Sequence, residues 1–135
     1  MIQRIQTIWL LLAAICAFLT LKFPFFSGST IDIAHVELNG QFNILLLILT
    51  AIVGSLAAVC IFLFRNRVIQ MRLVLVGLVL QIGCIALYFN AISKFTNGNF
   101  ALWSVFSFLV AIFFIMAMAA INKDQKLVKS MDRLR

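Results

Sequence analysis

The sequence predicts an all-α integral membrane protein: an antiparallel bundle of four transmembrane helices with both termini in the cytoplasm. Of its 135 residues, 64% are hydrophobic and 11% are charged, and the mean hydropathy is +1.14. Soluble domains are about half apolar, so this composition excludes an ordinary soluble protein. Four long apolar segments and a one-sided distribution of Lys and Arg complete the prediction.

The four apolar segments cover residues 5–26, 43–64, 70–89 and 100–121. A hydrocarbon core of about 30 Å requires about 20 apolar residues per helix, so each segment is long enough to cross it. We expect residues 1–121 to form the bundle and residues 122–135 to form a basic cytoplasmic tail.

The first segment, MIQRIQTIWLLLAAICAFLTLKFPFF, has features of both a leader peptide and a retained span. A lipoprotein leader requires a small residue before its cysteine, but Ile15 precedes Cys16. The apolar run continues well past Cys16, with no small-residue cleavage site before the loop. We therefore expect a retained first span with its start in the cytoplasm, next to Arg4.

The basic residues predict the orientation. With both termini inside, nine Lys and Arg residues lie in the cytoplasm and only Lys22 and Lys94 lie outside, as expected from the positive-inside rule. The candidates for fixing the topology or contacting lipid are Arg4, Arg65, Arg67, Arg72, Lys126, Lys129 and Arg133. The same rule explains the net charge of +7, so we do not expect a nucleic-acid partner.

The two outer connections contain turn-forming residues. Pro24 and Gly28 lie in the first, and Asn97 and Gly98 lie in the TNGN sequence of the second, which we expect to be a turn. Alternating apolar residues between positions 31 and 38, beginning with Ile31 and Ile33, favour a short extended stretch or hairpin at the bilayer surface.

The centres of the four segments contain no Asp, Glu, Lys, Arg or His. Transporters and pumps usually keep such a residue inside a span because it carries the proton or ion. The three cysteines form no CxxC pair, and neither HExxH nor GxSxG occurs. We therefore expect neither catalysis nor a cofactor.

Small and polar residues follow one face of the third segment, where Gly77, Gln81, Cys84 and Tyr88 are spaced by i, i+4, i+7 and i+11. This stripe would serve either as a polar pathway or as a helix contact, and the helix contact is favoured because small residues allow close approach. The full set of helix-packing candidates is Ala13, Ala17, Thr20, Gly54, Ala58, Gly77, Gln81, Cys84 and Tyr88.

The first outer loop contains the only histidine, His35, together with Asp32 and Glu37. A metal site requires at least three ligands in fixed geometry, so we expect no metal here. A partner-binding role is favoured because exposed loops on a rigid scaffold commonly carry recognition.

The tail is amphipathic: Leu127, Met131 and Leu134 line one face of a helix, and Lys126, Lys129 and Arg133 line another. It would lie along the inner membrane surface or dock its apolar face on a partner protein, and the sequence leaves both open. The candidates for partner docking are Leu127, Met131, Leu134 and His35.

The opening MIQRIQTIWLLLAA and the closing KDQKLVKSMDRLR resemble an uncharacterised family of four-span inner-membrane proteins of Bacteroidota, a domain of unknown function. The resemblance extends over the full length and includes the longer first outer loop. It implies a Gram-negative cytoplasmic membrane and assigns no catalytic or binding residues.

Our leading hypothesis is a non-catalytic accessory or structural subunit of a larger inner-membrane complex, in protein export or insertion or other envelope biogenesis. Its expected partners are the lipid bilayer and other membrane-protein subunits. One alternative is a small homo-oligomeric channel or facilitator lined by Thr50, Gln81, Ser104 and Ser107, since uncharged pores exist. A third is an enzyme acting on lipid or sugar at the outer face through Asp32, His35 or Glu37.

Overall fold

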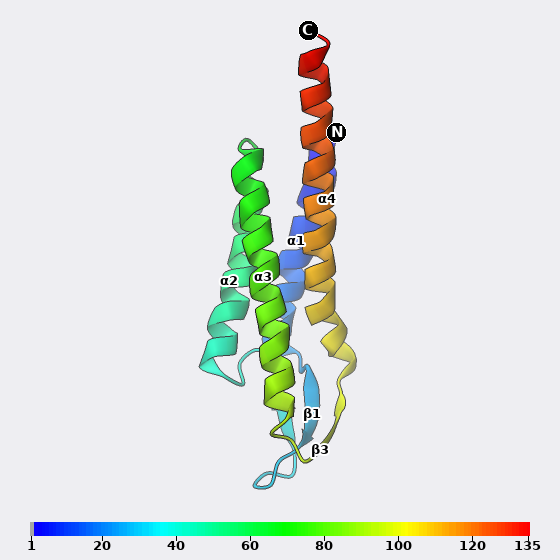
Figure 1. The fold of residues 1–135 in the computed structure, drawn as a ribbon. Helices are drawn as coiled ribbons and strands as arrows, with labels where there is room; N and C mark the ends of the chain where they lie inside the picture. Colours follow the sequence, from blue (N-terminus) through cyan, green and yellow to red (C-terminus); the bar gives the residue numbers. More distant parts are fainter. Residues whose placement is uncertain (1) are drawn as a thin grey trace.

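A computed structural model describes residues 2–135, with side chains described from Ile5 onward, and shows four helices and a small sheet (Figure 1). The helices are α1 (Ile2–Lys22), α2 (Ile44–Phe62), α3 (Arg67–Ile92) and α4 (Val105–Arg133), with a 3-10 turn, η1 (Leu102–Ser104), before α4. The strands are β1 (Phe26–Ser29), β2 (Val36–Leu38) and β3 (Asn97–Phe100).

Successive helices run in opposite directions, and each packs against two neighbours (Figure 1). Helix α1 contacts α2 and α4, and α3 contacts the same two helices from the other side of the bundle. Both termini lie at the same end as the α2–α3 connection (Figure 1). All four helices are long and apolar enough to cross a membrane, which confirms the prediction of four candidate spans.

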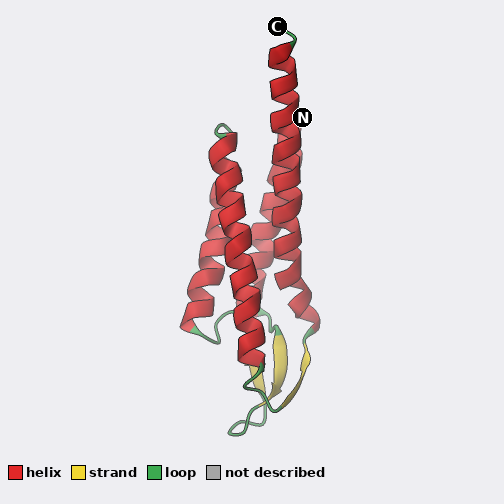
Figure 2. Ribbon diagram, in the orientation of Figure 1, coloured by secondary structure: helices red, strands yellow, loops and turns green. Residues whose placement is uncertain are grey.

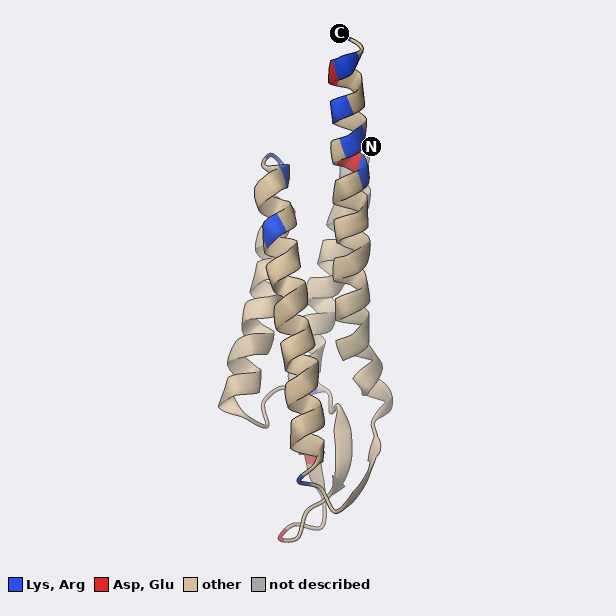
Figure 3. Cartoon of the chain, viewed as in Figure 1, with Lys and Arg blue, Asp and Glu red and all other residues tan. Residues whose placement is uncertain are grey.

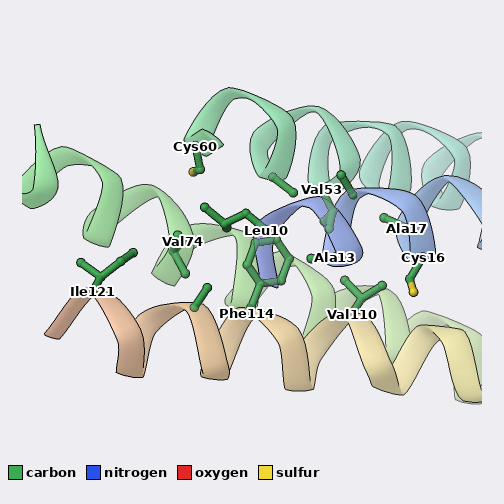
Figure 4. Packing of buried hydrophobic residues seen from close by; sticks show 13 residues of the cluster. Leu10, Ala13, Cys16, Ala17, Val53, Cys60, Val74, Val110, Phe114 and Ile121 are labelled. Carbon is green, nitrogen blue, oxygen red and sulfur yellow. The ribbon is translucent and has the colours of Figure 1, made fainter. Parts of the chain in front are cut away.

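The core of the bundle is a continuous apolar cluster with contributions from all four helices (Figure 4). The ring of Phe114 on α4 lies against α3 at Gly77, where a Cβ atom would approach the ring to 2.9 Å. The ring of Phe18 on α1 lies against Gly54 of α2 in the same way. Many large apolar side chains on the outer faces are about half exposed, as expected for helices that face lipid.

The all-α prediction is incomplete because the end of the molecule opposite the termini carries a three-stranded antiparallel sheet with the order β2-β1-β3 (Figure 2). The TNGN sequence belongs largely to β3 and is not a turn. Its Gly98 pairs with Gly28 of β1, and a Cβ atom on Gly98 would lie 2.8 Å from the Gly28 Cα atom. The hairpin expected in the first outer loop is present in part, because Val36–Leu38 form β2 and pair with β1, but Ile31 and Ile33 lie in the exposed loop between the two strands.

Helix α1 ends at Lys22, four residues before the predicted end of the first span. Proline disfavours helical geometry in the residue before it, so Pro24 stops the helix. The amide of Phe23 donates the last helical hydrogen bond to Leu19, and the amide of Phe25 already donates to the carbonyl of Leu38 at the sheet. The chain therefore passes directly from a helix into a strand.

Helix α4 continues without a break past residue 121 into the basic tail. No Gly or Pro occurs between residues 105 and 133, so nothing in the sequence interrupts the helix. The helix is 29 residues long, and its C-terminal part extends beyond the α2–α3 connection as a straight projection (Figure 1).

Candidate functional site: the charged end of the bundle

Most charged residues lie at the end of the bundle that contains both termini (Figure 3). Arg65 and Arg67 lie at the α2–α3 connection and the start of α3, and Arg72 lies farther along α3. The basic residues near the C-terminus are Lys123, Lys126, Lys129 and Arg133 on α4 and Arg135 after it. The predicted contact of Arg4 falls on a side chain outside the described part of the chain. Charge and surface chemistry thus distinguish this end from the rest of the molecule.

Asp124 on α4 is the centre of a buried polar cluster that joins three helices. Its Oδ2 atom lies 3.1 Å from Nη2 of Arg67 on α3 and accepts a hydrogen bond of 3.3 Å from Nε2 of Gln6 on α1. The side chains of Asp124 and Arg67 are 9% and 24% exposed. A carboxylate buried to this degree is costly without partners, and the ion pair with Arg67 and the hydrogen bond from Gln6 offset that cost.

The helical period of α4 determines where Asp124 points. The buried face of α4 continues through Phe114, Ala117 and Ile121 at spacings of three and four residues, and Asp124 follows at the next such spacing. Arg67 is the first residue of α3 and lies opposite it. We infer that this cluster holds α4 against α1 and α3 where the projection begins.

Two buried glutamines on α3 bind the backbone of neighbouring helices. Gln70 donates from Nε2 to the carbonyl oxygen of Cys60 on α2 over 2.9 Å. Gln81 donates from Nε2 to the carbonyl oxygen of Ser107 on α4, also over 2.9 Å. Hydrogen bonds between transmembrane helices contribute about 0.6 kcal/mol each on average, so they fix helix register more than they stabilise the fold.

Beyond Asp124, the projecting part of α4 leaves its apolar side chains exposed. The exposed fractions are 41% for Leu127, 69% for Met131 and 88% for Leu134. Their spacing of four and three residues places them on one face of the helix. This face, which we call the α4 docking face, is a candidate surface for protein contact.

The predicted helix-packing residues lie mainly in the interior. The buried ones are Ala13, Ala17, Thr20, Gly54, Gly77, Gln81, Cys84 and Tyr88. Ala58 is only half-buried, and its neighbour Ala57 occupies the fully buried position on α2.

The residues expected to line a channel, namely Thr50, Gln81, Ser104 and Ser107, are all buried within the single-chain bundle. A pore formed between copies of the chain would therefore not be lined by them. A pore through the bundle would have to displace the side chains that fill its core.

His35 and Glu37 lie close together on the surface, with Nε2 of the histidine 3.7 Å from Oε1 of the glutamate. Their side chains are 74% and 52% exposed, and Asp32 is also exposed. In the part of the chain that the structure describes, no group of three His, Cys, Asp or Glu residues is placed to hold a metal ion. The structure therefore builds no enclosed site around His35.

Comparison with known families gives a match over nearly the whole chain. The family model for DUF4293, a domain of unknown function, matches residues 2–134. The chain belongs to the DUF4293 family. None of the curated proteins matches the chain.

In this DUF4293 chain, sequence reasoning missed the buried polar cluster. Gln6 and Asp124 were not among the candidate residues, and Arg67 was considered only for topology or lipid contact. Continuing the spacing of three and four residues along α4 one step past Ile121 would have placed Asp124 on the buried face. Nothing in the local sequence signals that Gln6 reaches it, because that contact depends on α1 and α4 being neighbours.

Proposed function

We propose that this DUF4293 chain is a non-catalytic accessory subunit of a larger inner-membrane assembly, in protein export or insertion or other envelope biogenesis. The observation that carries the proposal is the straight continuation of α4 beyond the rest of the bundle with an exposed apolar face. The partner that fits this face is a protein helix with an apolar side of its own.

The length of α4 supports protein docking over contact with the membrane surface. At 1.5 Å per residue, a helix of 29 residues is about 43 Å long, whereas the hydrocarbon core is about 30 Å thick. A helix lying on the membrane surface would have to bend away from the bundle axis, and α4 is straight (Figure 1). Leu127, Met131 and Leu134 therefore lie beyond the hydrocarbon core, where a partner protein can cover them.

The proposed orientation places the α4 docking face in the cytoplasm. Support comes from the nine basic residues assigned to that side against Lys22 and Lys94 on the other. A reporter fused after Arg135 should be active only as a cytoplasmic fusion. A reporter inserted between Asp32 and Ile33, in an exposed loop, should be active only as an external one. The second outer connection is less suitable for an insertion, because its Asn97 pairs with Ser29 in the sheet.

Purification in a gentle detergent, followed by identification of the co-purifying proteins, tests the proposal. We expect the wild-type chain to recover a defined set of membrane proteins. The double substitution Leu127→Gln with Met131→Gln should reduce their recovery at least tenfold. The control is Val128→Gln, because Val128 is exposed to 42%, as Leu127 is to 41%, but lies about 100° around the helix from Leu127, on the side that faces the start of α3.

Two results would contradict the proposal. One is a wild-type chain that purifies as a clean monomer or homodimer. The other is a set of co-purifying proteins that is recovered equally with the double substitution and with Val128→Gln.

A further inference from the structure

A groove of about 860 Å³ lies between the start of α3 and the projecting part of α4. One side is formed by residues 64–69, which include the α2–α3 connection, and the other by α4. The α4 residues in it are Gln125, Val128, Lys129 and Asp132. The α4 docking face points in a different direction around the same helix, so the two surfaces are separate.

One part of the groove is apolar and accessible. Phe64, Val68, Ile69 and Val128 line it with exposed fractions of 50%, 59%, 47% and 42%. These side chains lie where the bundle ends, and exposed apolar residues of α2 and α3 continue from them along the outside of the bundle. An acyl chain in the bilayer would reach this wall by following those outer faces to the end of the bundle.

The other part of the groove is cationic. Within the described residues, neither Arg65 nor Lys129 has a carboxylate within ion-pairing distance, whereas Arg67 is paired with Asp124. Asp132 is the one acidic side chain in the lining, so the groove has a net positive charge. The Asn66 side chain makes no capping hydrogen bond to α3. The backbone amides in the first turn of α3 therefore lack a side-chain acceptor, and they lie beside the two cations, Arg65 and Lys129.

We infer that this groove binds one anionic phospholipid, with its phosphate between Arg65 and Lys129 and an acyl chain along the wall formed by Phe64, Val68 and Val128. Charge complementarity selects the anionic headgroup, and the apolar wall selects a lipid over a soluble phosphate. The inference does not depend on the proposed partner, because the α4 docking face contributes no residue to the groove.

Titration of the detergent-solubilised protein with phosphatidylglycerol, followed by native mass spectrometry, tests the inference. Removing both cations with Arg65→Gln and Lys129→Gln should weaken binding roughly 10- to 30-fold, as expected for two basic residues at a lipid surface. The control, Lys126→Gln with Arg133→Gln, removes the same charge outside the groove and should bind like the wild type. Arg67 is left intact because it is bonded to Asp124.

Three results would overturn the inference. Equal weakening in the control would show that overall charge attracts the lipid. Binding of phosphatidylcholine as tight as that of phosphatidylglycerol would show that the headgroup is not recognised. Binding of soluble glycerol phosphate as tight as that of phosphatidylglycerol would show a free-phosphate site. If the double variant fails to fold, Lys129→Gln alone, on the exposed part of α4, should show a smaller loss of the same kind.

Discussion

The two ends of the bundle are built from different interactions. At the sheet end, β1 pairs with both other strands, and aromatic rings pack beneath and beside them. The ring of Phe25, 2% exposed, stacks on Tyr88 with centroids 4.4 Å apart, and Phe26 contacts Phe100 edge to face. At the charged end, by contrast, a few buried polar contacts hold the helices, and α4 continues past them.

The two ends therefore differ in role: the sheet end closes the bundle, and the charged end offers surfaces for binding other molecules. Backbone pairing and stacked rings hold the sheet end together, although β3 and single apolar side chains such as Ile44 and Leu102 stay exposed there. The charged end leaves an apolar helix face and a cationic groove open to contact. We therefore assign recognition to the charged end, and the following substitutions test the contrast from the largest expected effect to the smallest.

Asp124→Ala should have the largest effect on stability. It leaves Arg67 and Gln6 without their shared acceptor, and removing one member of a buried ion pair is strongly destabilising. We expect the free energy of unfolding to fall by roughly 2 to 4 kcal/mol, at the low side of such effects because Arg67 remains 24% exposed. Unfolding by heat or by SDS in mixed micelles measures it.

The matched control for Asp124→Ala is Asp132→Ala, which removes an exposed carboxylate from the same helix. Its effect should stay within about 0.5 kcal/mol. Equal effects of the two substitutions would mean that the buried cluster does not hold the charged end together.

Gly98→Ala should destabilise the sheet end by about 2 kcal/mol. The new Cβ atom would lie 2.7 Å from the Ser27 carbonyl oxygen and 2.8 Å from the Gly28 Cα atom, so β1 and β3 must separate. Gly83→Ala on α3 is the control, since no atom of a neighbouring element lies within 4 Å of its Cβ position and alanine favours a helix. A stability equal to that of the control, measured by the same unfolding assay, would show that the tight pairing is not required.

Gln81→Leu should have the smallest effect, a loss of about 0.6 kcal/mol from the missing hydrogen bond to the Ser107 carbonyl. Leucine occupies a similar volume, so little of the packing changes. Unfolding in mixed micelles measures this change as well. A loss above about 2 kcal/mol would indicate that Gln81 takes part in a larger polar network.

The sequence carries enough information to predict the four helices because hydrophobic length and the distribution of Lys and Arg are local properties. Pro24 also indicates that α1 ends early. The predicted span was too long because the aromatic residues after Pro24, which lead into β1, are as apolar as the span itself. Strand β3 was missed because Asn97 and Gly98 are typical turn residues, and their pairing with β1 depends on the bundle bringing two distant connections together. Asp124 was missed for a similar reason, since its partners lie 57 and 118 positions away.

A photo-activated cross-linking residue placed at Met131 in living cells tests the central claim, that the charged end recognises a protein partner. The control places the same cross-linking residue at Ile82, in the middle of α3. The two positions are similarly accessible, since Ile82 is 57% exposed and Met131 is 69% exposed. We expect Met131 to yield an adduct with one defined protein, absent at Ile82 and lost when Leu127→Gln is added. Adducts with lipid alone at both positions would contradict the claim.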